Sequence, residues 1–425
     1  MLESLFERPA PGNRALLAHL RLGGPSRSSR EEDDLRLAEF RELVTSASLV
    51  CAGTVVGSRE RPHPRWFVGA GKVDELQEAI AASEADLVIF NHELTAIQQR
   101  NLETQLEKRV MTRTELILHI FADRARTGEG QLQVELAQLT HAQTRLIRSW
   151  THLDRQKGGV NLRGAGETQL EMDQRMLAGR VRYVRDRLER VHRQRAQSRR
   201  RRNRARVPTV ALAGYTNAGK STLFNALTAD GVHAADQMFA TLDPTMRRWQ
   251  VGPGAEVVLA DTVGFIRELP VTLVDAFKAT LEEIAEADLI LHVIDASSPD
   301  AGLAEEVRRV LAEIGAADTP TIEVFNKVDL LEGDAHCLGG VTVSALRGTG
   351  VEALRDTVAG RLGLDAKAVT VHLGPEAGKV RSWLYDHGAV EDETIGDDGT
   401  ATLHVRLDAA HVGELRQLAP EAMAR

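Results

Sequence analysis

The sequence is poor in aromatic residues and cysteine, and it has no long apolar run. Phe, Trp and Tyr together make up 4% of the 425 residues, so we expect a mostly aliphatic core. Cys51 and Cys337 are too few for a disulfide framework. No run of about 18 apolar residues predicts a transmembrane helix. The N-terminal stretch "MLESLFERPAPGNRALL" lacks the basic and apolar regions of a secretory signal, so we expect a cytoplasmic protein.

Charge is present in quantity but is unevenly distributed. The net charge of −8 argues against a general nucleic-acid binder. Residues 180–206, however, hold 13 arginines against only Asp186 and Glu189. This block favours contact with a polyanion, and the alternative is a solvated helix face.

The chain is long enough for roughly three domains of about 150 residues each. Strand-like and helix-like stretches alternate in residues 1–111, which predicts a small parallel α/β domain. Residues 112–206 are expected to form a helical arm, 207–364 a nucleotide-binding α/β domain, and 365–425 a small α+β domain. The fold class is therefore α/β with a helical insertion.

Two heptad patterns predict that the arm is an antiparallel hairpin. The seams consist of Leu132, Leu136, Leu139, Leu146, Trp150 and Leu153 in one helix, and Leu177, Val181, Val184, Leu188 and Val191 in the other. A glycine-rich loop, residues 154–167, joins them and is expected at the tip of a projecting rod. The alternative is an ordinary hairpin with an inert turn.

A phosphate-binding loop is predicted at residues 214–221, "GYTNAGKS", between a strand and a helix. Its backbone N–H groups would surround the phosphates at the helix N-terminus. Lys220 is expected to reach the β and γ phosphates, and Ser221 to offer its hydroxyl to Mg²⁺.

Three further segments follow strands, as the other nucleotide-binding motifs that accompany such a loop should. Asp261 can hold Mg²⁺, and the Gly264 N–H can sense the γ phosphate. The Asp329 carboxylate, in "FNKVD", can accept from two guanine donors that adenine lacks, and Ser344 and Ala345 fit a contact to the guanine oxygen. These motifs predict GTP rather than ATP as the nucleotide.

A switch threonine is expected in "FATLDPT", residues 239–245. Thr241 is the preferred second protein ligand to Mg²⁺ and Thr245 the weaker option. The residues expected to contact the nucleotide are Gly214, Tyr215, Thr216, Asn217, Ala218, Gly219, Lys220, Ser221, Thr222, Phe239, Ala240, Thr241, Leu242, Asp243, Asp261, Thr262, Val263, Gly264, Asn326, Lys327, Val328, Asp329, Ser344, Ala345 and Leu346. The metal ligands among them are Ser221, Thr241 and Asp261, and the catalytic residues are Lys220, Asn217, Thr241 and Gly264.

Two positions in the sequence have competing interpretations. Phe265 stands where many GTP hydrolases carry a water-orienting glutamine, and a phenyl ring cannot make that hydrogen bond. It could instead be a packing residue. Gly69, Gly71 and Lys72 form half of a second phosphate loop, for which a structural turn is favoured over a second nucleotide site.

With these residues together, the chain resembles the HflX family of translation-factor-related GTPases over about residues 14–360. The most specific stretches are "ELILHIFADRARTGEGQLQVELAQL", "LRGAGETQLEMD", "GYTNAGKSTLFN", "FATLDPT" and "DTVGF". The resemblance implies binding to the large ribosomal subunit and its rRNA, with the arm tip near the peptidyl transferase centre. It also implies splitting or rescue of stalled ribosomes, often under stress, by a protein expected to be a monomer.

The resemblance bears on how GTP is hydrolysed without a glutamine at position 265, and this chain also departs from the family pattern in and near the predicted loop of the arm. Family members carry a hydrophobic residue at the position of Phe265 and hydrolyse GTP, and Asn217 matches an asparagine that helps to hold K⁺ in related GTPases. The family usually has glycine, proline and arginine where this chain has Asn161, Ala165 and Gln174. Two other readings stay open: a GTP-gated RNA-binding or assembly module in which hydrolysis is only a timer, and a GTPase scaffold for protein partners.

Overall fold

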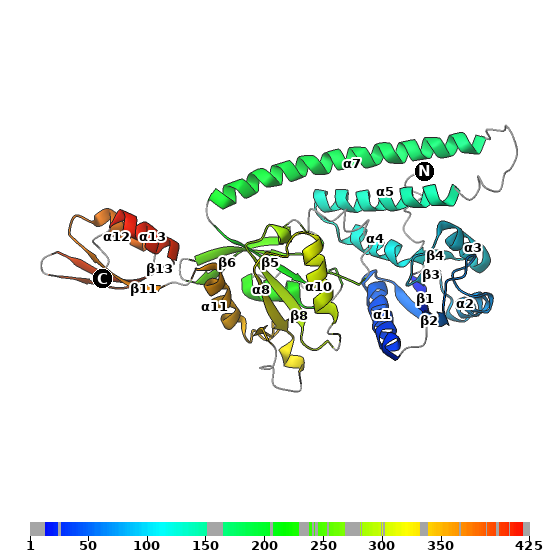
Figure 1. Ribbon diagram of the computed structural model, residues 1–425, viewed down its shortest axis with the longest axis horizontal. Coiled ribbons are helices and arrows are strands. Elements are labelled where there is room, and N and C mark those ends of the chain that lie inside the picture. Colours follow the sequence, from blue (N-terminus) through cyan, green and yellow to red (C-terminus); the bar gives the residue numbers. More distant parts are fainter. Residues whose placement is uncertain are drawn as a thin grey trace. The chain divides into compact units, whose positions relative to one another are not determined.

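The computed structural model describes residues 13–419, except 24–26, 151–164, 205–206, 229–237, 240–241, 243–244, 253–254, 268–280, 282, 299, 301, 332–338, 365–366, 388, 397–398 and 408. The chain forms two compact units. The first comprises residues 1–195 together with 236–243 and 267–278, and the second contains the rest. Figure 1 shows the elements of both units.

The first unit is built on a parallel sheet, as the sequence predicts, and its fourth strand, β4 (Arg109–Thr112), was not identified from the sequence. The strands β1 (Arg14–Leu22), β2 (Val50–Arg59), β3 (Leu87–Phe90) and β4 lie in the order β2-β1-β3-β4. Helices α1 (Arg27–Ser46), α2 (Ala70–Ser83), α3 (Ala96–Leu106) and α4 (Arg113–Arg124) alternate with them. Every residue of β3 is buried, because helices cover both faces of a parallel sheet.

The helical arm of the first unit consists of α5 (Gly128–Trp150) and α7 (Ala165–Arg204), which lie side by side in Figure 1. The two predicted seams meet: Leu132 and Leu139 of α5 form one buried cluster with Leu177, Val181, Val184 and Leu188 of α7. The predicted loop 154–167 is helical from Ala165 onward, and its remainder, with Asn161, lies outside the described residues. The hairpin prediction is therefore confirmed.

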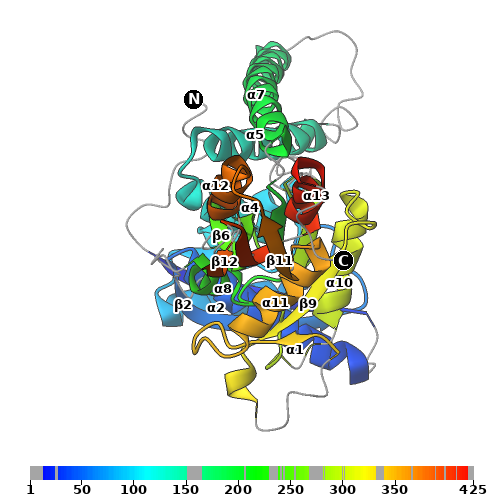
Figure 2. The same cartoon turned by 90° about the vertical axis from the view of Figure 1, so that its left-hand side faces the viewer.

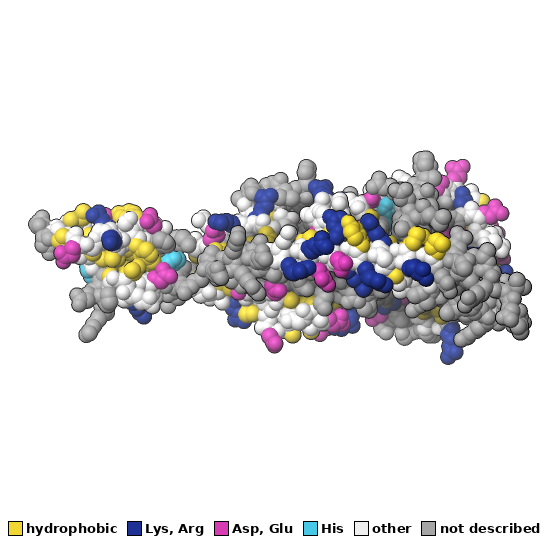
Figure 3. All heavy atoms as spheres, turned by 90° about the horizontal axis from the view of Figure 1, so that it is seen from above, with side chains coloured by type: hydrophobic (Ala, Val, Ile, Leu, Met, Phe, Trp, Pro, Cys, Tyr) yellow, Lys and Arg dark blue, Asp and Glu magenta, His cyan; other side chains and the backbone are white. Residues whose placement is uncertain are grey.

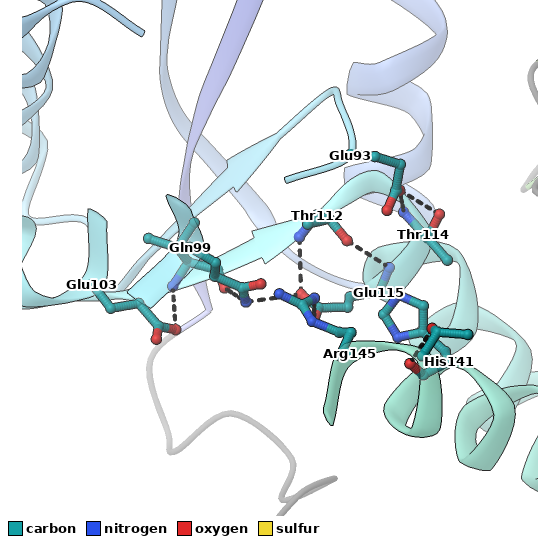
Figure 4. A network of polar contacts seen from close by, with 10 residues as sticks. Glu93, Gln99, Glu103, Thr112, Thr114, Glu115, His141 and Arg145 are labelled. Carbon is teal, nitrogen blue, oxygen red and sulfur yellow. Dashed lines mark hydrogen bonds and ion pairs between the residues drawn. The ribbon is translucent and has the colours of Figure 1, made fainter. Parts of the chain in front are cut away.

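A polar network joins α5 of the hairpin to the sheet (Figure 4). The Thr112 side chain caps α4, and Glu115 returns the bond by accepting from the Thr112 N–H at 3.0 Å. The same carboxylate pairs with Arg145 of α5 and accepts from the Gln99 amide of α3 at 3.2 Å. Nearby His141 of α5 is half-buried, and its loss of contact with water lowers its pKa to about 4. One glutamate thus ties the hairpin to α3, β4 and α4.

The second unit contains a six-stranded sheet in the order β10-β9-β8-β5-β7-β6. Strands β5 (Thr209–Gly214), β7 (Ala255–Asp261), β8 (Leu289–Asp295), β9 (Thr321–Asn326) and β10 (Val341–Thr342) are parallel, and β6 (Thr245–Gly252) is antiparallel to β7. Helices α8 (Lys220–Thr228), α10 (Gly302–Glu313) and α11 (Val351–Leu362) complete the layers. The core is aliphatic, with Val210, Leu212, Leu259, Leu291 and Val324 fully buried.

The end of the chain forms the predicted α+β domain. Its antiparallel sheet has the order β11-β13-β12, made by β11 (Lys367–Leu373), β12 (Ala389–Ile395) and β13 (Ala401–Leu407). Helices α12 (Gly378–His387) and α13 (Ala409–Leu418) lie on the same side of this sheet in Figure 2. None of the described helices has the length and apolar character needed to cross a membrane.

Strands β6 and β12 were not identified from the sequence. Each is the edge strand of its sheet, and each carries charged residues, "TMRRWQVG" and "AVEDETI". Charged side chains are common on edge strands because one side of the strand faces water, so the apolar pattern is weak there.

Candidate nucleotide-binding site

The predicted phosphate loop connects β5 to α8 in the second unit. The backbone of Asn217 and Gly219 is left-handed, with φ of 63° and 87°, which curls the chain around the space before the helix. A Cβ on Gly219 would lie 2.2 Å from the Asn326 side-chain nitrogen, so no larger residue fits. The loop therefore has the geometry that places backbone N–H groups around an anion at a helix N-terminus.

Lys220 is the buried cation of the site. It is 6% exposed, and its ammonium donates to the Gly214 and Tyr215 carbonyls at 3.0 and 2.7 Å. Burial lowers the pKa of Lys220 to about 8, although the nearby Asp261 charge opposes the shift. A nucleotide phosphate would add negative charge beside this side chain and favour its protonated form.

Two hard oxygen donors meet where α8 begins and β7 ends. The Ser221 hydroxyl donates to the Asp261 carboxylate at 2.8 Å, and Asp261 is 2% exposed. A hydroxyl and a carboxylate are ligands that suit Mg²⁺, which also takes oxygens from substrate phosphates. This pair of side chains therefore fits the predicted metal site.

The turn after β7 is joined to the phosphate loop through its backbone. Phe265 donates its N–H to the Gly214 carbonyl at 3.1 Å, and its own carbonyl accepts the Thr216 N–H at 2.7 Å. The Phe265 side chain is 3% exposed. Phe265 is thus a packing residue whose backbone joins the turn to the phosphate loop, and its buried ring has no group that could hydrogen-bond to water.

The predicted guanine-binding residues come together at the ends of β9 and β10. Asn326 donates to the Ala218 carbonyl at 2.9 Å and accepts the Ala345 N–H at 3.0 Å, so it links the phosphate loop to the base-binding loops. The Ser344 hydroxyl donates to Asp329 at 2.6 Å, and this hydrogen bond is the main reason why the pKa of Asp329 is lowered. An ionised carboxylate is the acceptor that the two guanine donors need.

Two residues of this region were missed by sequence reasoning. Asp295, which ends β8, pairs with Lys327 at 2.7 Å and holds its side chain across the loop. Arg347 lies 3.7 Å from Asp329 and donates its N–H to the Ser344 hydroxyl at 3.2 Å. The signal for Asp295 was available, because this acid directly follows a buried strand that neighbours the phosphate-loop strand.

Other predicted contact residues occupy the same loops of the second unit. Thr262 is buried and donates its hydroxyl to the Leu212 carbonyl at 2.6 Å, so its side chain is structural. Leu346 is 81% exposed. The remaining members of the predicted set lie in these loops or in the first turn of α8: Tyr215, Thr216, Ala218, Thr222, Val263 and Val328.

The described residues of the predicted switch segment before β6 belong to the first unit. Phe239 belongs to the first unit, where its ring packs edge-on against Phe121 with 4.7 Å between centroids. Leu242 is also buried there. Ala240, Thr241 and Asp243 lie outside the described residues, so the assignment of Thr241 to Mg²⁺ stays a prediction.

The second glycine loop has the features of a structural turn. Lys72 donates to the Val56 carbonyl at 3.0 Å and pairs with Glu75 at 2.6 Å. The cavity beside it holds about 10 Å³, which is room for one water molecule at most and far too little for a nucleotide. These contacts favour the interpretation of Gly69–Lys72 as a turn at the start of α2.

Comparison with known proteins identifies the family over most of the chain. Four family descriptions match consecutive segments: "GTP-binding GTPase N-terminal" at residues 34–122, "GTP-binding GTPase Middle Region" at 124–202, "50S ribosome-binding GTPase" at 209–327 and "HflX C-terminal domain" at 330–422.

Close relatives agree with these matches. The GTPase HflX of Escherichia coli (strain K12) is 49% identical over 414 residues, which covers 95% of each chain. The GTPase HflX of Magnetococcus marinus is 46% identical over 388 residues, covering 89% of this chain and 90% of the relative. With a phosphate loop, an oxygen-donor pair and a guanine-binding loop in place, this chain is a P-loop GTPase that hydrolyses GTP, and it belongs to the HflX family.

Proposed function

We propose that this GTPase acts in the cytoplasm as a monomer that binds the large ribosomal subunit through its hairpin arm and splits or rescues stalled ribosomes under stress. Support comes from the matched family descriptions, one of which reads "50S ribosome-binding GTPase". The structural observation that carries the proposal is the outer surface of α7.

That surface combines positive charge with exposed apolar side chains. Figure 3 looks onto it and shows dark-blue Lys and Arg side chains beside yellow apolar ones. Met172, Met176 and Tyr183 are 60, 47 and 50% exposed. The exposed arginines of the described part of α7 are Arg175, Arg180, Arg182, Arg185, Arg187, Arg190 and Arg193.

Arginines and an aromatic ring also contact each other on this surface. The guanidinium groups of Arg180 and Arg187 lie 5.2 and 5.9 Å from the centre of the Tyr183 ring. Guanidinium groups bind phosphates, and exposed planar groups stack on unpaired bases, so the combination suits a folded RNA better than a smooth protein surface.

The hydrolytic step is assigned to residues that the nucleotide site provides. Lys220 holds the β and γ oxygens, the Gly264 N–H donates to the γ phosphate, and Asn326 keeps the phosphate loop and base loops in register. Mg²⁺ held by Ser221, Asp261 and Thr241 would neutralise charge on the phosphates when bound.

Asn217, which is exposed and has a left-handed backbone, is the residue that would offer its amide oxygen to K⁺ beside the phosphates. A cation there could replace an arginine finger, whose effect on the rate is on the order of 10³–10⁵. Because buried Phe265 cannot orient water, intrinsic turnover should be slow and should depend on a partner.

The test is co-sedimentation with isolated large subunits in the presence of a non-hydrolysable GTP analogue or GDP, combined with single-turnover hydrolysis. We expect binding with the analogue, release with GDP, and faster hydrolysis with subunits present. Gradient centrifugation of intact ribosomes should then show separated subunits.

The alternatives have different outcomes. Binding and hydrolysis without loss of intact ribosomes would support the GTP-gated RNA-binding or assembly module. An absence of ribosome binding in both nucleotide states would contradict the proposal and favour a scaffold for protein partners.

A further inference from the structure

A cavity of about 190 Å³ lies in the first unit, at the carboxyl end of its parallel sheet. It is lined by His19 and Leu20 at the end of β1 and by Asn91 and His92 just after β3. The connection through α1 carries the chain from β1 to β2 on one side, whereas β3 lies on the other side of β1. The cavity therefore lies at the point where the strand order reverses, which is where parallel α/β sheets bind ligands.

A chain of hydrogen bonds sets the donors around this cavity. Arg113 donates to the Asn91 side-chain oxygen at 2.8 Å, so the Asn91 amide nitrogen faces His19 Nδ1 at 3.1 Å and donates to it. The His19 proton is then on Nε2. That atom is buried and has no hydrogen-bond partner within the described structure.

His92 is also neutral and oriented. Its Nε2 accepts the Leu20 N–H at 3.0 Å, which places its proton on Nδ1. Its ring stacks on that of His19 with 5.4 Å between centroids. Two imidazoles, one in β1 and one just after β3, are thus held as donors of fixed tautomer.

The lining carries net positive charge. Arg36, Arg113 and Arg267 line the cavity, and Asp33 is the one acid among the described residues of the lining. Behind them Glu39 pairs with Arg113 at 2.5 Å and lies 3.8 Å from Arg267, so it neutralises part of the charge but leaves an excess. Burial first, and then the other histidine, Arg113 and Arg36, lower the pKa of His92 to about 4.

We propose that this cavity binds a small oxyanion through its phosphate or carboxylate group, held by Arg36, Arg113 and the imidazole donors. Guanidinium groups favour such groups because their N–H donors match two oxygens at once. The volume is below the roughly 300–1,000 Å³ of pockets for larger ligands, so a nucleoside triphosphate is not expected there. The occupant would also contact Arg267, three residues after Gly264 in the chain.

The experiment uses the full chain saturated with Mg²⁺ and GDP, so that the phosphate loop is filled. Isothermal titration calorimetry with inorganic phosphate and, separately, with succinate measures binding at constant ionic strength. We expect one site per chain for at least one of these anions. Binding of phosphate but not succinate would show that the cavity recognises a phosphate group, and binding of succinate but not phosphate that it recognises a carboxylate.

Two matched pairs of variants locate the site. Asp33→Asn removes the acid found in the described lining and should tighten binding at least threefold, while Asp34→Asn, one residue along α1, should leave it unchanged. Arg36→Gln should weaken binding at least tenfold, and Arg41→Gln, exposed on the same helix, should not. If Arg36→Gln fails to fold, the effect of Asp33→Asn on the anion affinity still tests the location of the site.

The proposal is overturned if neither anion shows saturable binding, or if Asp33→Asn and Asp34→Asn behave alike. Binding that is indifferent to Asp33→Asn would place the anion at the nucleotide site instead. These measurements involve neither hydrolysis nor ribosomes, so their outcome is independent of the proposed function.

Discussion

At the scale of single residues, the buried Lys220 links nucleotide binding to pH. Its pKa of about 8 in the free protein means that near pH 8 about half of the side chains are neutral. Phosphates favour the ammonium form, so GTP binding should raise this pKa and take up a proton. Affinity should fall as pH rises above 8, by at most about tenfold per unit.

Calorimetry of GTP binding at pH 8 in two buffers of different ionisation enthalpy measures this uptake. Lys220→Arg is the control, because a guanidinium stays charged and should take up no proton. Equal heats for the wild type in both buffers would contradict the prediction.

Gly264 is required by close approach. A Cβ at this position would lie 2.8 Å from Thr216 Cγ2 and 2.9 Å from the Thr216 Cα, and backbone cannot move aside. Gly264→Ala should therefore slow single-turnover hydrolysis at least tenfold while GDP affinity changes less than threefold. Gly252→Ala, whose Cβ would meet only Ala255 at 3.7 Å, is the control and should hydrolyse GTP normally. Equal rates for both variants would refute the assignment.

Guanine selection is assigned to Asp329, held by the Ser344 hydroxyl at 2.6 Å. Asp329→Asn replaces an acceptor by a donor, which suits the extra carbonyl of xanthine. The variant should bind GTP at least tenfold more weakly and bind xanthosine triphosphate more tightly than the wild type does. Competition binding with the two nucleotides measures this, and an unchanged preference for GTP would show that the loop is wrongly assigned.

At the scale of elements, the hairpin depends on the bond between Glu115 of α4 and Arg145 of α5. Glu115→Gln keeps an acceptor for the Thr112 cap but leaves Arg145, which is 22% exposed, without its charge partner. The expected cost is about 1–2 kcal/mol, between that of exposed pairs and that of fully buried pairs.

Native-state hydrogen exchange should show the loss as about tenfold less protection in α5. Glu256→Gln breaks the exposed pair with Arg248, which is 78% exposed, and should change protection little. If both variants left α5 equally protected, the pair would have no role in docking the hairpin.

At the scale of the whole molecule, buried and half-buried histidines should set its acid stability. Burial lowers the pKa of His92, His141 and His292 to about 4, so each is neutral in the folded protein at pH 7. The unfolded chain protonates near pH 6.5, so stability is lost as pH falls from 6.5 to 4 and is fully present above 6.5. The upper limit is about 3 kcal/mol for each histidine.

His92 and His141 belong to the first unit and His292 to the second, so both units should weaken in acid. Urea unfolding at pH 7, 5.5 and 4.5 measures the effect. His292→Gln should flatten the pH dependence of the second unit alone. A midpoint that stays constant between pH 7 and 4.5 would show that these groups do not remain neutral on folding.

Much of the nucleotide site and the hairpin could be predicted from the sequence, because short-range rules govern them. Each motif of the nucleotide site directly follows a strand: the glycines of the phosphate loop, the seryl hydroxyl at the start of the helix, and the asparagine and lysine before Asp329. Parallel strands bring their carboxyl ends to one edge of the sheet, so these motifs meet there. Heptad spacing likewise places Leu132, Leu139, Leu177 and Val181 on facing stripes. These patterns hold whatever surrounds them.

Tertiary packing alone decided the rest. Phe265 was ambiguous until its ring proved buried and its backbone bonded to Gly214 and Thr216. The cavity of the first unit unites residues 19, 33, 36, 91, 92, 113 and 267, which share no motif. Local sequence determines what a turn or helix can do, but residues far apart in the chain meet only where close packing of whole elements brings them together.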